Sequence, residues 1–241
     1  MRPVSHPAFP LALFDEPDDA TRWIGGWLKK IVVPHRAAGA PPLAAVFDID
    51  ATLLNRAGAI EPVVALFDLC ARLGIARYIV TARREVARAY TLEELELLGV
   101  RDFGGSAHLF MLADGASLRG NEMRRRVGMS KRRARKQIAK QYQIALHVGD
   151  QWTDHFSVDE QPETLAGIDG GMVFFADKND DGTERSDRGV LAINHEYLDL
   201  GLLYENGIES HSAENVRKAQ AAVGVSLVNI HRDAEMKWHR D

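Results

Sequence analysis

The stretch Leu43-Ala-Ala-Val-Phe-Asp48-Ile-Asp50-Ala-Thr52-Leu-Leu-Asn55 places two carboxylates directly after an apolar run. Such a run is typical of a buried β-strand, and open α/β sheets bind their ligands at the carboxyl ends of these strands. Because side chains alternate between the two faces of an extended segment, Asp48 and Asp50 are expected on one side. Close carboxylates repel each other, and a divalent cation is the usual partner that keeps them ionised. Taken alone, the segment also fits a strand end with two solvated turn acids.

Strand and helix patterns alternate along the chain on both sides of this stretch. We predict strands at residues 43–49, 77–80, 109–112, 144–148 and 172–176. We predict helices at residues 19–33, 62–73, 91–99 and 130–143. The third of these helices begins with a capping-box pattern at Thr91 and Glu94. The alternation predicts an α/β fold with a doubly wound, Rossmann-like parallel sheet flanked by helices.

The size and composition of the chain are those of an ordinary globular protein. Its 241 residues are enough for one substantial core. We predict an N-terminal tail and helix over residues 1–42, a catalytic core over 43–200 and a C-terminal helical segment over 201–241. The net charge of −4 gives no overall sign of nucleic-acid or membrane binding, and Cys70 is the only cysteine. With no secretory signal or bilayer-spanning run in the sequence, we expect a cytoplasmic protein and no membrane partner.

Three further groups of polar residues follow the predicted strands or open the next helix. Thr81-Ala82-Arg83 ends the second strand and resembles a helix N-cap that binds a phosphoryl oxygen. Lys131 shares a helix face with the apolar residues 134, 138 and 142, near the expected start of a helix. A lysine there indicates a fixed anion nearby, unless it extends past the core to solvent. The strand at 144–148 leads to two more acids, Asp150 and Asp154.

Together these groups meet the demands of phosphoryl transfer, in which catalysis depends on alignment and charge stabilisation. Asp48 would attack phosphorus to give an aspartyl-phosphate, and Asp50 would protonate the leaving oxygen and then activate water. Mg²⁺ would be held by Asp48, the Asp50 carbonyl and Asp150, with Asp154 orienting its waters. Thr81 and Lys131 would neutralise the remaining phosphoryl oxygens.

With these residues in place, the chain resembles the phosphatases of the haloacid dehalogenase (HAD) superfamily, whose Asp-x-Asp-x-Thr motif matches Asp48, Asp50 and Thr52. The strings 81–85, 91–99 and Gly149-Asp-Gln-Trp-Thr-Asp154 are similar to its acid phosphatase branch, which includes plant vegetative storage proteins. The resemblance spans roughly residues 45–156. It implies the roles given above, a Mg²⁺ cofactor and phosphate or substrate contacts at Thr52, Ala82 and Arg83.

The chain departs from that branch at Ala51, where Glu is usual, and at Ala82, where Gly is common. Only a helix and a strand fit between Thr52 and Thr81, so we expect little or no cap and an open site, unless residues 113–129 or the C-terminal segment cover it. Arg124–Arg126 and Lys131–Lys136 would give that site a basic rim, or else form a solvated helix face.

Three functions therefore remain open. The first is a Mg²⁺-dependent phosphomonoesterase acting on a phosphorylated small molecule or macromolecule end. The second is a nucleic acid 3′-phosphatase, with nucleic acid as the substrate only. The third is a storage or phosphate-binding protein without turnover. The sequence leaves homo-oligomer formation open. The loop Asp177–Gly182 resembles half of a calcium loop but lacks its closing Glu, which favours an Asx-rich turn.

Overall fold

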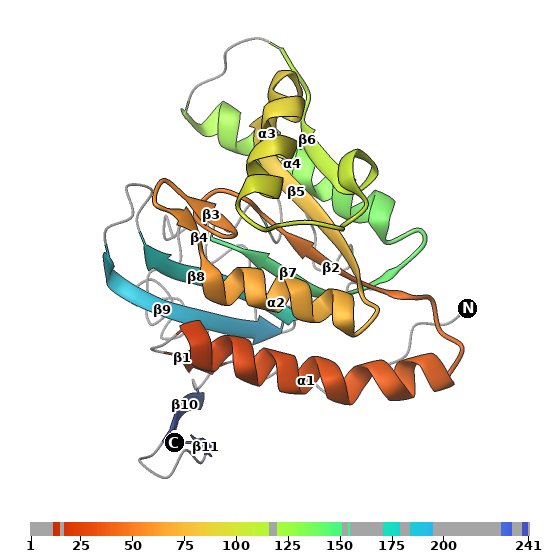
Figure 1. The fold of residues 1–241 in the computed structure, drawn as a ribbon, viewed down its shortest axis with the longest axis vertical. Helices are drawn as coiled ribbons and strands as arrows, with labels where there is room; N and C mark the ends of the chain where they lie inside the picture. The colour runs from red at the N-terminus through yellow and green to blue at the C-terminus, as the bar shows by residue number, and fades with distance from the viewer. Residues whose placement is uncertain are drawn as a thin grey trace.

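The computed structural model describes residues 12–14, 17–115, 120–150, 154, 171–178, 184–194, 228–232 and 238–240. Its centre is a parallel sheet in the spatial order β6-β5-β2-β7-β8 (Figure 1). These strands are β2 (Leu43–Phe47), β5 (Ala76–Arg84), β6 (Leu109–Leu112), β7 (Gln143–Gly149) and β8 (Gly171–Lys178). The predicted doubly wound α/β fold is thereby confirmed, and all five predicted strands are present.

Further strands extend the sheet beyond β8. Strand β9 (Glu184–Asn194) pairs antiparallel with β8 and with β1 (Ala12–Phe14). Beyond β1 lie β10 (Val228–Arg232) and β11 (Trp238–Arg240), so the described parts of the segment predicted as helical at 201–241 are strands. Residues 179–182 of the predicted Asx-rich turn (Asp177–Gly182) lie outside the described residues.

The helices pack on the sheet through their apolar faces. Helix α1 (Pro17–Ala37) lies along α2 (Glu61–Arg72) on the face nearest the viewer in Figure 1. A Cβ on Gly25 would come within 2.5 Å of Leu69, so this glycine permits the close approach of α1 to α2. Helix α1 starts two residues before and ends four residues after the predicted helix of residues 19–33, and it includes Gly25, Gly26 and Pro34.

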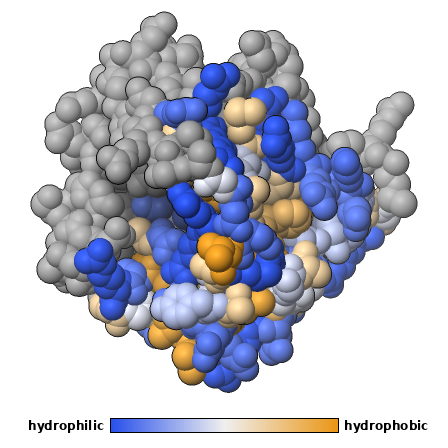
Figure 2. All heavy atoms as spheres, turned by 90° about the horizontal axis from the view of Figure 1, so that it is seen from above, coloured by the Kyte–Doolittle hydropathy of each residue, from blue (hydrophilic) through white to orange (hydrophobic). Residues whose placement is uncertain are grey.

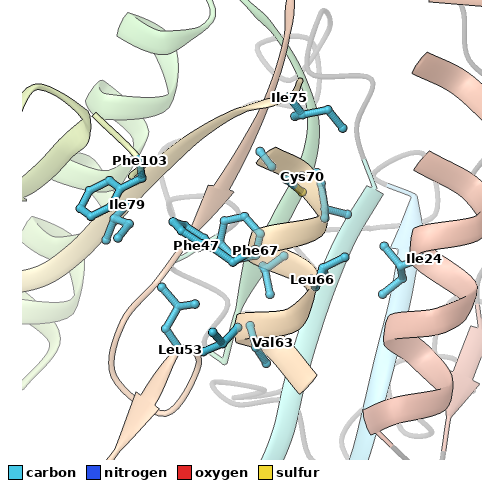
Figure 3. Close-up of a cluster of buried hydrophobic side chains, with 14 of the residues drawn as sticks. Ile24, Phe47, Leu53, Val63, Leu66, Phe67, Cys70, Ile75, Ile79 and Phe103 are labelled. Atoms are coloured by element: carbon cyan, nitrogen blue, oxygen red, sulfur yellow. The ribbon is translucent and has the colours of Figure 1, made fainter. Parts of the chain in front are cut away.

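The core lies between α1, α2 and the central strands (Figure 3). Phe47 of β2 meets Phe67 of α2 edge to face at a centroid distance of 5.0 Å, and Phe103 packs on the other side of Phe67 at 6.0 Å. Cys70 is fully buried in the same cluster, and burial raises the pKa of its thiol to about 12. This packing fixes the position of β2 and therefore of the segment that follows it.

A hairpin of two short strands and two 3₁₀ turns in the central region were not predicted from the sequence. Strands β3 (Leu54–Asn55) and β4 (Gly58–Ala59) form a hairpin between β2 and α2, in addition to the expected helix and strand. After β5 the chain forms a 3₁₀ turn, η1 (Glu85–Ala87), and then helix α3 (Arg88–Leu97). A second 3₁₀ turn, η2 (Gly105–His108), precedes β6.

Two predicted helix starts are wrong. The capping box at Thr91 does not begin a helix, because α3 starts at Arg88 and Thr91 is buried inside it. Helix α4 (Gly120–Ile138) starts ten residues before the predicted residue 130 and includes most of the segment 113–129 considered as a cover. Helix α4 packs on β5 and β6. Within the residues that the structure describes, no helix combines the length and apolar composition needed to cross a membrane. The cytoplasmic location stays a prediction.

Candidate active site

Strand β2 carries Asp48 to the carboxyl edge of the sheet. All five residues of β2 are buried, and the Asp48 backbone N–H continues the ladder by donating to the Val148 carbonyl of β7 at 2.9 Å. The Asp48 side chain is itself buried. Because a buried carboxylate loses its hydration, it requires compensating partners from neighbouring elements.

The compensating partner is Lys131 of α4, and two further acids also lie close to Asp48. Asp48, Asp150 and Asp154 each place a carboxylate oxygen within 4.8 Å of the other two, and all three side chains are buried. We call these three residues the acidic cluster. The Lys131 ammonium lies 2.9 Å from Asp48 Oδ1 and forms a short ion pair with Asp154. Lys131 is only 3% exposed, so it does not extend past the core to solvent.

The electrostatics of the cluster follow from this crowding. Burial, together with Asp154 and Asp150, raises the pKa of Asp48 well above its ordinary value, and Lys131 opposes that rise. Burial alone would lower the pKa of Lys131, but Asp154 and Asp48 outweigh it and raise that pKa. Lys131 is therefore a permanent cation against the three acids.

Asp154 is held in this position by two features of the fold. A Cβ on Gly149 would lie 2.5 Å from Asp154 Cγ, so a side chain at Gly149 would displace the carboxylate. The fully buried Arg135 donates from Nη1 to the Asp154 carbonyl at 3.0 Å. Gly149 thus provides the space for the carboxylate, and Arg135 fixes the backbone behind it.

The Asp50 side chain is directed differently from that of Asp48. It is 54% exposed, and its carboxylate is bound by Arg83 instead of joining the acidic cluster. Nη2 of Arg83 lies 2.6 Å from Asp50 Oδ1, and its Nε is 3.0 Å from each Asp50 oxygen. The turn that follows has Ala51 at φ 57°, a left-handed conformation that is unusual for alanine.

Thr52 and Thr81 are both buried, and of their two hydroxyl groups only that of Thr81 has a described hydrogen bond. Thr52 Oγ1 has no hydrogen-bond partner among the described residues. Thr81 lies within β5 instead of capping a helix, because β5 continues to Arg84 and no side-chain cap precedes η1. Its Oγ1 accepts a 3.2 Å hydrogen bond from the Arg83 backbone N–H. Ala82 between them is exposed.

Lys131 points inward as predicted, but the predicted cause, a position at the start of a helix, is wrong. Lys131 lies in the second half of α4 and not at the start of a helix, so the repulsion from a helix dipole does not apply. The anions that hold it are Asp48 and Asp154. Arg135, which belongs to the predicted basic rim, is instead buried one turn further along α4. Its i+4 spacing from Lys131 is the sequence signal that could have identified it.

The acidic cluster fits a hard divalent cation. Its three carboxylates offer oxygen ligands, which such cations prefer, from side chains already excluded from bulk water. Lys131 supplies one positive charge and Arg135 another nearby, so the acids still outnumber the cations when all three are ionised. A bound cation would complete the charge balance.

Comparisons with known proteins agree with this site. Residues 55–165 match the family model described as HAD superfamily, subfamily IIIB (acid phosphatase). This segment contains Thr81, Lys131, Asp150 and Asp154 but begins after Asp48 and Asp50. The family match and the α/β fold support an HAD-superfamily acid phosphatase and, as its activity, a phosphomonoesterase. The resemblance predicted from the sequence is confirmed.

A second family model overlaps the first. Residues 137–241 match the model of the alkaline phosphatase PhoX. In the overlap, residues 137–165, strand β7 pairs in parallel with β2 and leads to Asp150 beside Asp48. The described residues that both family models match therefore belong to the central sheet and contribute to the acidic cluster.

Weaker likenesses come from solved structures, and none of the curated proteins matches the chain. The class C acid phosphatase from Bacillus anthracis with tungstate bound is 16% identical, with a TM-score of 0.43 over 62% of this chain and 70% of that one. Another structure of the class C acid phosphatase from Bacillus anthracis has a TM-score of 0.45 at 16% identity, over 82% and 87% of the two chains. A hypothetical protein from Pyrococcus horikoshii OT3 has a TM-score of 0.26 at 16% identity, over 79% and 71%. Because all three TM-scores are below 0.5, these similarities support no conclusion about fold or function.

Proposed function

We propose that the protein is a Mg²⁺-dependent phosphomonoesterase that works through an aspartyl-phosphate on Asp48. The observation that carries this proposal is the buried Asp48 carboxylate, held 2.9 Å from Lys131 within the acidic cluster. A carboxylate kept away from water beside a fixed ammonium group is suited to nucleophilic attack on a phosphoryl group whose oxygens are negative.

The residues then divide the reaction into two displacements. In the first, an Asp48 oxygen bonds to phosphorus while the bond from phosphorus to the leaving oxygen breaks, and Asp50 protonates that oxygen. In the second, Asp50 takes a proton from water, whose oxygen attacks phosphorus and releases Asp48 together with inorganic phosphate. The Lys131 ammonium and the Thr81 hydroxyl would bind phosphoryl oxygens in both steps.

The acidic cluster would hold the metal, with the Asp50 backbone carbonyl as a further ligand. Mg²⁺, when bound, would keep Asp48 ionised despite its neighbours and would stabilise negative charge on the phosphoryl group. Mg²⁺ is a hard cation that commonly binds one or two protein carboxylates and the substrate phosphate, so Asp48 and Asp150 would be its carboxylate ligands and Asp154 would orient its waters.

The test is phosphate release from nucleotides, sugar phosphates and an aryl phosphate, each measured with Mg²⁺ or with chelator. We expect release that the chelator abolishes. Asp48→Asn should remove turnover without unfolding the protein, because Lys131 keeps its ion pair with Asp154. Asp18→Asn, at an exposed acid of α1, should change neither turnover nor stability. Undiminished turnover by Asp48→Asn would refute the mechanism.

A storage or binding role without turnover is the less favoured alternative. Loss of the nucleophile is the simplest route to an inactive phosphatase fold, and here Asp48 is retained together with Lys131. Phosphate binding by a folded protein that releases no phosphate from any ester would favour that role.

A nucleic acid 3′-phosphatase is a second candidate, favoured by the outer surface of α4. This helix has eight lysines and arginines and one glutamate, a formal charge of +7 in a chain whose total is −4. Arg125, Arg133 and Lys136 are exposed on it. Figure 2 views the end of the molecule that carries α3, β6 and α4, and its described surface is mostly hydrophilic. The sequence of α4 has repeated cations and no aromatic residue, a composition that suits a phosphate backbone better than stacked bases or a lipid bilayer.

Not all of the predicted basic rim contributes to this surface. Lys131 and Arg135 are buried, and Arg126 donates to the carbonyls of Ala113 and Asp114 at 3.2 and 3.3 Å. The exposed surface of α4 therefore has fewer positive charges than its sequence indicates. These exposed charges lie on the same helix that contributes Lys131 to the candidate active site.

This candidate is tested by comparing a 3′-phosphorylated oligonucleotide with a mononucleotide. We expect a higher kcat/KM for the oligonucleotide that falls with salt, and a weaker salt dependence in Arg133→Ala/Lys136→Ala. Lys29→Ala/Lys30→Ala removes two exposed charges from α1 and is the matched control. Equal kcat/KM values for both substrates at low salt would exclude the nucleic acid as the preferred substrate.

A further inference from the structure

Arg83 connects helix α3 to the carboxylate proposed as the acid and base. Its guanidinium makes a forked ion pair with Asp50 on one side and a short ion pair with Glu94 of α3 on the other. We propose that Glu94 is a positioning residue that, through Arg83, holds the Asp50 carboxylate in its reactive orientation. This inference rests on the proposed function of Asp50.

The contact between Arg83 and Asp50 restrains both carboxylate oxygens. Nε of Arg83 is 3.0 Å from each oxygen, and Nη2 is 2.6 Å from Oδ1. Two or more hydrogen bonds from a planar guanidinium restrict rotation of a carboxylate, which a single bond does not. Without Arg83, a side chain that is 54% exposed would be free to turn towards solvent.

Arg83 is itself restrained by groups other than Asp50. The remaining arm, Nη1, contacts Glu94 Oε2, and the Arg83 backbone N–H donates to Thr81 Oγ1 at 3.2 Å. Glu94 is about one quarter exposed and lies in the interior of α3, so its backbone is fixed by the helix. The restraint therefore passes from a helix to a charged side chain and then to Asp50.

This restraint is useful because the turn behind Asp50 offers little of its own. Ala51 follows at φ 57°, a conformation that costs energy for a residue with a Cβ, and no side-chain contact other than Arg83 is described for Asp50. Proton transfer needs the carboxyl group within hydrogen-bond reach of the leaving oxygen, and a misplacement of about 1 Å can cost roughly 100-fold in rate.

A comparison of substrates with different leaving groups distinguishes a loss of Asp50 positioning from a general disturbance of the structure. An alkoxide is a poor leaving group and depends on a proton from Asp50, whereas a nitrophenolate leaves with little assistance. The value of kcat/KM reports the steps up to aspartyl-phosphate formation and hence departure of the leaving group. Loss of Glu94 should therefore reduce kcat/KM for alkyl phosphates far more than for an activated aryl phosphate.

The experiment measures kcat/KM of Glu94→Gln and Glu94→Ala on an alkyl phosphate and on a nitrophenyl phosphate with Mg²⁺. We expect a loss of about tenfold or more for the alkyl ester and less than about threefold for the aryl ester, given the usual contribution of general acid catalysis. Glu93→Gln is the matched control, because Glu93 is an exposed acid next to Glu94 on α3. Glu94→Gln preserves side-chain size, so it tests the proposal even where Glu94→Ala fails to fold.

A double-mutant cycle with Arg83→Met tests the route of the effect. If Glu94 acts through Arg83, the pair of substitutions costs no more than Arg83→Met alone. Equal losses on both esters, no loss in Glu94→Gln, or additive losses in the cycle would overturn the inference while leaving an active phosphatase. Absence of turnover in the wild type would instead overturn the proposed function.

Discussion

Replacing Lys131 by methionine should destabilise the protein strongly when no metal is bound and much less when Mg²⁺ is present. The ammonium is 3% exposed, lies 2.9 Å from Asp48 and contacts Asp154. Methionine has a similar length but no charge, so the three buried acids lose this counter-charge. Removing one partner of a buried ion pair costs about 3–5 kcal/mol, a large part of the roughly 5–15 kcal/mol that stabilises a typical domain.

The loss should depend on pH in a defined direction. The folded-state pKa of Asp48 already lies above its ordinary value, and loss of Lys131 raises it further. A carboxyl group with a raised folded-state pKa contributes stability that is present below its unfolded pKa and is lost as pH rises through the folded value. Lys131→Met should therefore be less destabilised in mild acid than at neutral pH.

Urea unfolding with chelator and with Mg²⁺ measures both effects. Lys136→Met, which removes an exposed charge from the same helix, is the control and should change stability by less than about 0.5 kcal/mol. Equal unfolding free energies for the two variants in chelator, or a loss in Lys131→Met that Mg²⁺ does not reduce, would refute the account of the acidic cluster.

Three further predictions concern single residues. Gly149→Ala should reduce the affinity for Mg²⁺, measured by calorimetry, because its Cβ would lie 2.5 Å from Asp154 Cγ; unchanged affinity would contradict this. Ala51→Val should cost about 1–3 kcal/mol of unfolding free energy, because a β-branched residue disfavours φ 57°, whereas Ala51→Gly should fold normally. Burial raises the pKa of Cys70 to about 12, so its thiol should react with a thiol reagent at pH 8 only after unfolding. Its contribution to the unfolding free energy should decline as pH rises from about 9 towards 12. Rapid labelling of the folded protein would show that the thiol is accessible.

The central strands were predictable because their signal is local. Every residue of β2 and β7 is buried, and a strand covered on both faces consists of a nearly continuous apolar run, which in β7 includes two polar residues, Gln143 and His147. The meeting of Asp48 with Asp150 followed from the same pattern, because parallel strands end at a common edge. The acids of the cluster could therefore be identified from the sequence.

The start of α4 was not predictable from apolar periodicity. Residues 120–130 contain three consecutive arginines and two glycines, and only Met123 and Val127 extend the apolar face of residues 134 and 138 towards the start of the helix. The hairpin of β3 and β4 has two residues in each strand, too few for an alternating pattern. The roles of Arg135 and Glu94 depend on contacts between distant segments, which no local pattern encodes.

The order of the strands has a consequence for how the chain folds. Leu43 at the start of β2 pairs with Gln143 of β7, so about 100 residues separate the two strands that carry Asp48 and Asp150. Closing a loop of this length costs conformational entropy before the strand pairing contributes any stabilisation, so such contacts tend to form slowly. During synthesis, β2, α2, β5 and β6 emerge before β7. A ribosome-bound chain that ends before residue 143 would hold Asp48 at a sheet edge without its partner acids, so catalytic competence would arise only once β7 inserts beside β2.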